Sequence, residues 1–463
     1  MADVPITLVS HSRGKDDSIR VKEWPEGRPA TLFNDAHAVA EWLAQYVRSG
    51  EADDAPRLFL LSSASRESLD LLEGLYKTYV EDGKTPPDQV PHTPASRRGH
   101  ERNRAYVLVG PRQMMQISPA MDSSPPSRIL WAFTSQGAQW AGMGVELLDS
   151  NDVFRQAIRR LDASRTSLPS PPASTIEADL RDPTISNRLF KVPQFRLTVA
   201  VQIALVQVLR SWNLAPDMVM GISSGETAAG YACGALSAEA AIAITYSLAI
   251  SGLTEKDEQK TGRFAVLSLG PQQVTPYLEP GVFLAAKFSP FEVALSGVAD
   301  KVEKVLDNIR AQQPDVLITT YPSGLAWHSC HEDFAKHMPA FEEATQPLIQ
   351  AAEPTVPFFS TVTGGRLEGS GFLVPSYWRA NFEGTIHLHS GFRAAIGDRL
   401  DRVLVIEIGP HTSHKRPIRQ IADELGLDLV YLHTLERDVS CRQNLLRLSG
   451  QLFQHKIAIP GVD

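Results

Sequence analysis

A serine flanked by glycines at residues 221–225 is the first feature of this chain that could carry chemistry. Residues 218–220 are apolar and indicate the end of a buried strand, and the residues from Thr227 onward are typical of a helix. A Gly-x-Ser-x-Gly sequence in that setting forms a tight turn that holds a serine hydroxyl clear of the backbone. The N–H groups and positive dipole end of the following helix favour an oxyanion. We therefore predict that Ser223 is a nucleophile, against the alternative of a turn that only closes a sheet.

A nucleophilic serine needs a base, and histidine is the usual one. His328 follows the last strand of a predicted inserted subdomain, at a strand edge that would face a cleft. His331 lies three residues further on, and spacing alone does not rank the two histidines. A nucleophilic role for Cys330 is the alternative to Ser223.

Composition narrows the classes of function. The chain has 463 residues, of which 43% are hydrophobic and 21% charged, and a net charge of −8, so we expect a globular protein without a nucleic-acid partner. Its three cysteines form no C-x-x-C pair, which argues for a reducing compartment and against a metal site. The start lacks the pattern of a secretory signal, and the apolar stretch 199–209 is too short and too polar to span a bilayer. We expect a cytoplasmic enzyme without a membrane partner.

The order of the helices and strands that must position Ser223 and His328 predicts an α/β fold. Apolar strands at residues 129–133, 358–362 and 403–408 and a buried helix at 193–212 predict a core with a parallel sheet. The β-α-β-β-α-β order over residues 264–321 is the ferredoxin-like arrangement. The predicted regions are a loosely attached extension (1–55), a small α/β unit (56–127), the core (128–262 and 326–430), the inserted subdomain (263–325) and a closing segment (431–463).

Four motifs in this order resemble a known family. The chain is similar to the acyltransferase domain of type I polyketide synthases, of the fungal highly reducing kind, and more distantly to malonyl-CoA:carrier-protein transacylases. The resemblance runs from about residue 57 to 458 and includes a linker-like unit before the domain and a segment after it. Its motifs lie at residues 134–144, 221–237, 326–329 and 407–411. The resemblance implies an α/β-hydrolase-like core.

The resemblance also implies roles for individual residues. Ser223 would be the nucleophile and His328 its base and acid, in a ping-pong reaction. The backbone N–H groups of Gln136 and Ser224 would form the oxyanion hole, and the backbone carbonyl of Asn381 would orient the imidazole. Trp327 would pack against the histidine and line the cleft.

Departures from the family pattern concern the acyl pocket. Ile222 stands where the family nearly always has histidine, and Leu248 where it has the arginine that pairs with a malonyl carboxylate. Phe288 replaces the asparagine of an Asn-Ser-Pro sequence. A carboxylate buried without its partner would cost several kcal/mol. We therefore expect a pocket for an uncharged acyl chain.

The expected protein is a free-standing acyltransferase of polyketide biosynthesis that moves a non-carboxylated acyl chain. The donor would be a carrier-protein phosphopantetheine or CoA thioester, with no bound cofactor, and the acceptor a small-molecule hydroxyl or a thiol. Three alternatives stay open. The first is a transferase that loads malonyl or methylmalonyl groups in trans, with Lys287 in place of the missing arginine as the cation for the carboxylate. The second is an editing thioesterase, and the third is a non-catalytic docking protein.

Overall fold

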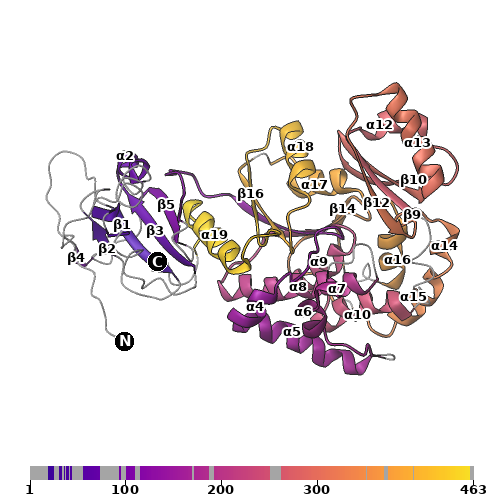
Figure 1. The fold of residues 1–463 in the computed structure, drawn as a ribbon, viewed down its shortest axis with the longest axis horizontal. Coiled ribbons are helices and arrows are strands. Elements are labelled where there is room, and N and C mark those ends of the chain that lie inside the picture. Colours follow the sequence, from indigo (N-terminus) through magenta and orange to yellow (C-terminus); the bar gives the residue numbers. More distant parts are fainter. Residues whose placement is uncertain are drawn as a thin grey trace. The chain divides into compact units, whose positions relative to one another are not determined.

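The computed structural model describes residues 19–24, 31–33, 36, 38–40, 42–43, 56–72, 93–94, 101–109, 115–168, 171–186, 192–250, 262–350, 352–369, 374–399 and 401–458. Two compact units contain them (Figure 1). The first comprises Met1–Pro125, Trp212–Leu214 and Arg442–Asp463, and the second Pro126–Ser211 and Ala215–Cys441. Among the described helices, none combines the length and the apolar character that crossing a bilayer requires.

The first unit is built on an antiparallel sheet in the order β4-β2-β1-β3-β5-β6. Helix α2 (Arg66–Asp70) begins after the N-cap residue Ser65, whose side chain accepts a hydrogen bond from the backbone N–H of Ser68. The extension expected over residues 1–55 supplies two strands of this sheet, so it is not a loose appendage. The strands are β1 (Ile19–Trp24), β2 (Thr31–Phe33), β3 (Arg57–Ser63), β4 (Thr93–Pro94), β5 (Asn103–Val109) and β6 (Met115–Ile117).

The second unit contains the core sheet, in the order β14-β13-β8-β7-β15-β16. Five strands are parallel, and only the edge strand β14 is antiparallel. The predicted boundary after residue 430 falls inside β16, so the core sheet extends into the segment expected to follow it. The strands are β7 (Arg128–Phe133), β8 (Met218–Gly221), β13 (Phe358–Ser360), β14 (Gly365–Leu367), β15 (Val403–Ile408) and β16 (Leu429–His433).

Both faces of this sheet are covered, which is why its strands are apolar without alternation. Side chains of α17 and α18 pack with alternate residues of β7, β8 and β15 in one cluster. The helices are α4 (Val145–Ser150), α5 (Asp152–Ser164), α6 (Ile176–Arg181), α7 (Pro183–Ser186), α8 (Val192–Ser211), α9 (Gly225–Ala232), α10 (Ala238–Ile250), α14 (Glu332–Ala335), α15 (Met338–Thr345), α16 (Pro375–Glu383), α17 (Leu388–Ile396) and α18 (Lys415–Leu425), with a 3₁₀ turn at Arg165–Ser167. Helix α19 (Cys441–Gln454) follows the sheet.

The inserted subdomain has the predicted ferredoxin-like topology. Its antiparallel sheet has the order β10-β11-β9-β12, and α12 and α13 lie on one face of it (Figure 1). Its first helix is short and ends in a 3₁₀ turn at Thr275–Tyr277. The elements are β9 (Gly262–Leu267), α12 (Pro271–Val274), β10 (Val282–Ser289), β11 (Glu292–Val298), α13 (Ala299–Gln312) and β12 (Ile318–Gly324).

Candidate active site

The turn between β8 and α9 has the strained geometry of a nucleophile elbow. Ser223 has a φ of +52°, in the left-handed region that non-glycine residues rarely adopt. A Cβ at Gly221 would lie 2.3 Å from the backbone of Glu226, and one at Gly225 would lie 2.5 Å from the carbonyl oxygen of Phe133. The strand and helix can approach this closely only with glycine at both positions.

Ser223 and His328 form a hydrogen-bonded pair. The serine Oγ lies 2.8 Å from the histidine Nε2, and both side chains are buried. The histidine Nδ1 lies 3.0 Å from the backbone carbonyl oxygen of Gly384, which can only accept a hydrogen bond. Nδ1 therefore carries the proton and Nε2 is the acceptor for the serine hydroxyl. This arrangement assigns the contact with Ser223 to His328 rather than to His331.

The residue that orients the imidazole is Gly384, so the prediction for Asn381 is corrected. Helix α16 ends at Glu383, and carbonyl groups beyond the end of a helix have no partner in that helix. The side chain of Asn381 instead donates from Nδ2 to the backbone carbonyl oxygen of Ser223, at 3.0 Å. Asn381 thus holds the elbow itself.

Burial keeps the imidazole neutral. Desolvation lowers the pKa of His328 from 6.5 to about 4, and the bond to the carbonyl of Gly384 acts in the opposite direction but is smaller. A neutral imidazole at physiological pH can accept the proton of the serine hydroxyl. The pair is therefore ready for nucleophilic catalysis without a third carboxylate.

Two backbone turns meet at this pair. Gln136 lies in the loop after β7, where its side-chain Oε1 accepts a hydrogen bond from Gln139. Ser224 is the N-cap residue of α9. Within the described ranges, the backbone N–H groups of Gln136 and Ser224 donate to no protein acceptor. Both N–H groups can therefore donate to a bound oxyanion, and the role that the family resemblance implies for them stays a prediction.

Glu407 holds the loop that follows β15. This carboxylate is buried and accepts hydrogen bonds from the backbone N–H groups of Ser413 and His414 and from the hydroxyl of Tyr431. The imidazole Nε2 of His414 lies 3.2 Å from the hydroxyl of Ser135, beside Gln136. His414 therefore contacts the loop that carries Gln136.

The serine–histidine pair opens on a cavity of about 470 Å³ between the core and the inserted subdomain. Phe288 and Trp327 line this cavity, as predicted. Trp327 packs against Phe195, with ring centroids 5.0 Å apart. The apolar and aromatic residues of the lining include Phe195, Phe264, Val266, Phe288, Tyr321, Trp327 and Ile386.

Ile222 and Leu248, predicted to line the acyl pocket, are not among the residues that line this cavity. Both side chains are buried. Ile222 packs into the core cluster with Met220 and Phe359, because the side chain that follows β8 turns toward the sheet rather than toward the cleft.

Two arginines that the sequence analysis missed also line the cavity. Arg416 forms an ion pair with Glu292, with Nε 3.2 Å from Oε2. Arg437 donates to the backbone carbonyl oxygen of Gln139 at 3.0 Å. Lys287, the cation nominated from sequence, is not in the lining. Both arginines lie far from Ser223 in the chain, so only the fold reveals them.

Glu226 connects the elbow to two other elements. Its buried carboxyl accepts hydrogen bonds from the backbone N–H of Thr361, at 2.5 Å, and from the hydroxyl of Tyr377. Burial raises its pKa from 4.5 to about 7, although these donors act to lower it. The carboxyl thus ties α9 to the end of β13 and to α16, the helix that carries Asn381.

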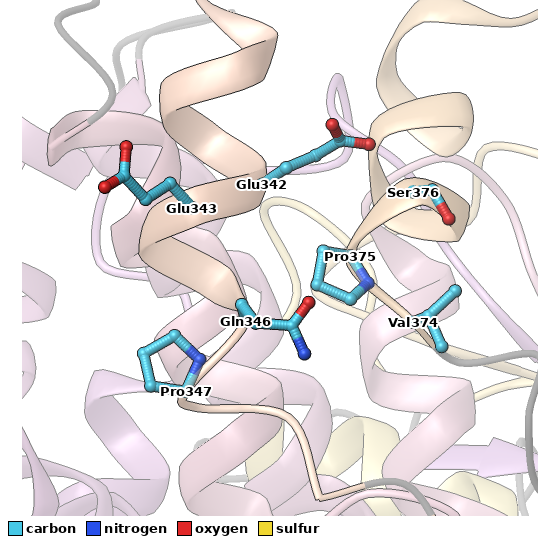
Figure 2. Close-up of a pocket in the computed structure, with 7 residues that line it drawn as sticks. All are labelled: Glu342, Glu343, Gln346, Pro347, Val374, Pro375 and Ser376. Atoms are coloured by element: carbon cyan, nitrogen blue, oxygen red, sulfur yellow. The ribbon is translucent and has the colours of Figure 1, made fainter.

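Other candidate sites lack this chemistry. A cavity of about 540 Å³ lies between α15 and α16, where Figure 2 shows Glu342, Glu343, Pro375 and Ser376 around it, without a histidine. Cys330 is exposed, and its thiol donates to the carbonyl oxygen of Glu383 rather than lining the catalytic cavity. Within the described part of the chain, no cluster of His, Cys, Asp or Glu is arranged as metal ligands.

Comparison with known proteins identifies the family. The model of the acyl transferase domain matches residues 130–458. The highly reducing polyketide synthase lcsB of Purpureocillium lilacinum is 37% identical over 97% of this chain, and FUM1 of Gibberella moniliformis is 36% identical over 98% of it. The chain spans only 18% of the length of each of these synthases.

Solved structures of acyltransferase domains have the same fold as this chain. A loading acyltransferase from the avermectin modular polyketide synthase is 27% identical, with a TM-score of 0.62 over 70% of this chain and 99% of that one. The acyltransferase domain from module 8 of the salinomycin polyketide synthase shares the fold, with 20% identity and a TM-score of 0.70 over 96% of this chain and 97% of that one. The chain therefore belongs to the acyltransferase domain family of polyketide synthases and is an acyltransferase.

Proposed function

We propose that this acyltransferase moves a non-carboxylated polyketide or fatty acyl chain, through an ester on Ser223, to a hydroxyl or thiol acceptor. The observation that carries the proposal is the cavity next to the Ser223–His328 pair. Apolar and aromatic side chains line that cavity, and of its two arginines Arg416 is already paired with Glu292. An uncharged chain gains from burial against these side chains, whereas a carboxylate would lose its hydration and find Arg416 bound to Glu292 and Arg437 bound to the backbone carbonyl oxygen of Gln139.

The reaction has two steps of the same kind. The Ser223 hydroxyl gives its proton to Nε2 of His328 and attacks the thioester carbonyl carbon, and the carbon–sulfur bond breaks as the thiol leaves with that proton. The acceptor hydroxyl or thiol then gives its proton to Nε2 and attacks the carbonyl carbon of the ester. The bond between this carbon and the Oγ of Ser223 breaks, and Nε2 returns the proton to the Oγ. In both steps the N–H groups of Gln136 and Ser224 stabilise the oxyanion.

The donor is a thioester on the phosphopantetheine arm of a carrier protein or of CoA. Acyltransferase domains of this family act with such donors, and the curated relatives are synthases of the highly reducing kind. The similarity to an acyltransferase described as a loading enzyme supports a starter or finished chain as the acyl group.

A second candidate is the loading of a malonyl or methylmalonyl group onto a carrier protein. The arginines in the cavity lining favour it, because a guanidinium is the usual partner of a carboxylate. Binding of a malonyl carboxylate would require Arg416 to break its ion pair with Glu292, or Arg437 to break its hydrogen bond with the carbonyl group of Gln139.

Intact-protein mass spectrometry tests the proposal. The protein is incubated separately with octanoyl-CoA, octanoyl carrier protein and malonyl-CoA, and the same donors are given to Ser223→Ala and His328→Ala. Cys330→Ala is the matched control, since it removes an exposed thiol that could be acylated without catalysis. We expect an octanoyl adduct in the wild-type protein and in Cys330→Ala, and none in Ser223→Ala.

The other outcomes identify the alternatives. A malonyl adduct that dominates over the octanoyl adduct would favour the loader. Release of free acid without an acceptor would indicate an editing thioesterase. The absence of an adduct from every donor would indicate a docking protein without catalytic activity.

A further inference from the structure

An ion pair in the wall of the catalytic cavity connects the inserted subdomain to the core. Glu292 begins β11 and Arg416 lies in the first turn of α18, and both side chains line the cavity. The side chain of Glu292 is 10% exposed and that of Arg416 is 55% exposed. Within the described ranges, Arg416 is the one ion-pair partner of Glu292.

The two members of this pair differ in their exposure to solvent. Burial raises the pKa of Glu292, and the neighbouring guanidinium of Arg416 lowers it. Removal of the Glu292 carboxylate leaves the half-exposed guanidinium of Arg416 in the cavity lining without its ion-pair partner. That guanidinium could then form a charge-assisted hydrogen bond with a carboxylate on an entering acyl chain.

The ion pair is not what holds the two subdomains together. The hydroxyl of Ser289 donates to Oε1 of Gln420 at 2.5 Å, which connects β10 to α18 independently. The backbone N–H of Lys287 also donates to the carbonyl oxygen of Ile386 at 2.8 Å. A change at Glu292 should therefore alter the charge of the cavity and preserve its architecture.

We propose that Glu292 is a specificity-determining residue, which keeps Arg416 occupied and so excludes dicarboxylic acyl groups from the cavity. The inference rests on the proposed function and deepens it, because it names the group that sets the substrate class. A carboxylate on an incoming acyl chain meets the negative charge of Glu292 and a guanidinium that is already bound. An uncharged chain meets neither obstacle.

The test is a competition in single-turnover acylation. Wild-type protein and Glu292→Gln are mixed with octanoyl-CoA and, in separate arms, an equal concentration of malonyl-, succinyl- or glutaryl-CoA. The ratio of the two adducts is read by intact mass. We expect the dicarboxylic-to-octanoyl ratio to rise roughly 10- to 100-fold in Glu292→Gln for at least one chain length, as a hydrogen bond to a charged group allows. Glu292→Ala must change the ratio in the same direction.

Two variants serve as controls. Glu303→Gln disrupts a different ion pair of the same subdomain, that between Glu303 and Arg263, with a nitrogen–oxygen distance of 3.0 Å. Neither residue lines the cavity, so this variant should leave the ratio at the wild-type value. The double variant Glu292→Gln/Arg416→Gln should lose the gain, because the guanidinium that Glu292→Gln releases is then absent, while Arg437 is the same in every variant.

The results separate this inference from the function on which it rests. An octanoyl adduct in the wild-type protein with an unchanged ratio in both Glu292 variants would overturn the role of Glu292 and leave the proposed function standing. A gain that persists in the double variant would also overturn it. The absence of an octanoyl adduct in the wild-type protein would instead refute the proposed function.

Discussion

At the scale of single residues, the chemistry depends on one neutral imidazole. His328 is buried between the hydroxyl of Ser223 and the carbonyl of Gly384, and no carboxylate of the described residues forms an ion pair with it. Desolvation disfavours the charged form of a histidine, so the proton on Nε2 is bound only weakly. His328 therefore remains neutral, and able to accept a proton, at pH values at which an ordinary histidine is already protonated.

The pH dependence of acylation follows from this. With a pKa of about 4, His328 is the active neutral base above pH 4 and becomes protonated below it. We expect the single-turnover rate constant for acylation to be level from pH 7.5 to 5.5, and to fall about tenfold per pH unit below pH 4. Stopped-flow mixing with a chromogenic thioester measures this, and an inflection near pH 6.5 would contradict the burial argument.

Asn381 provides a second prediction at this scale. Its side chain holds the backbone carbonyl of Ser223, a residue with positive φ, and so positions the nucleophile. Asn381→Ala should lower the acylation rate constant about tenfold and leave the pKa of the rate profile unchanged. Asn381→Asp lacks the donor and should not restore the rate. A rate equal to that of the wild-type protein in Asn381→Ala would refute this positioning role.

At the scale of elements, the elbow could be predicted from sequence because its causes are local. A strand, two glycines, a serine and a helix start lie within a dozen residues, and each constrains its neighbours. The partner of His328 could not be predicted in this way. It depends on where α16 ends relative to β12, and the carbonyl that reaches the imidazole is three residues beyond Asn381.

The elbow glycines give a matched pair of variants. A Cβ at Gly225 would lie 2.5 Å from the carbonyl oxygens of Phe133 and Thr134, whereas one at Gly365 would meet nothing within 4 Å. Gly225→Ala should lower the free energy of unfolding by about 2–3 kcal/mol, and Gly365→Ala should change it by less than about 0.5 kcal/mol. Urea unfolding measures both values. Equal effects would show that α9 and the end of β7 are not packed as closely as described.

At the scale of the whole molecule, the general architecture followed from the order of apolar segments, but its boundaries did not. Strand β1 pairs with β2 and with β3 although the sequence of this segment has weak periodicity, and β16 completes the core sheet beyond the expected limit. The charged residues of the cavity could not be predicted from the sequence either. Arg416 and Glu292 are more than a hundred residues apart, and only tertiary packing brings them together.

Buried Glu226 links the protein's stability to pH. Its pKa is raised from 4.5 to about 7, so between these values the folded state binds more protons at this site than the unfolded state. Its contribution to stability therefore falls as pH rises through this window, by about 2–3 kcal/mol. Relative to the wild-type protein, Glu226→Gln should be more stable at pH 8 than at pH 5. Thermal unfolding at both pH values measures the difference, and an equal effect at both would contradict a protonated Glu226.

The central claim is that Ser223 accepts an uncharged acyl group in preference to a carboxylated one. The most direct measurement is one competition in one tube, with equal concentrations of octanoyl-CoA and malonyl-CoA, quenched after a single turnover and mapped by peptide mass spectrometry. The account predicts that the peptide containing Ser223 carries the octanoyl group almost exclusively. A Ser223 peptide that carries mainly malonyl, or an octanoyl group on another residue, would contradict it.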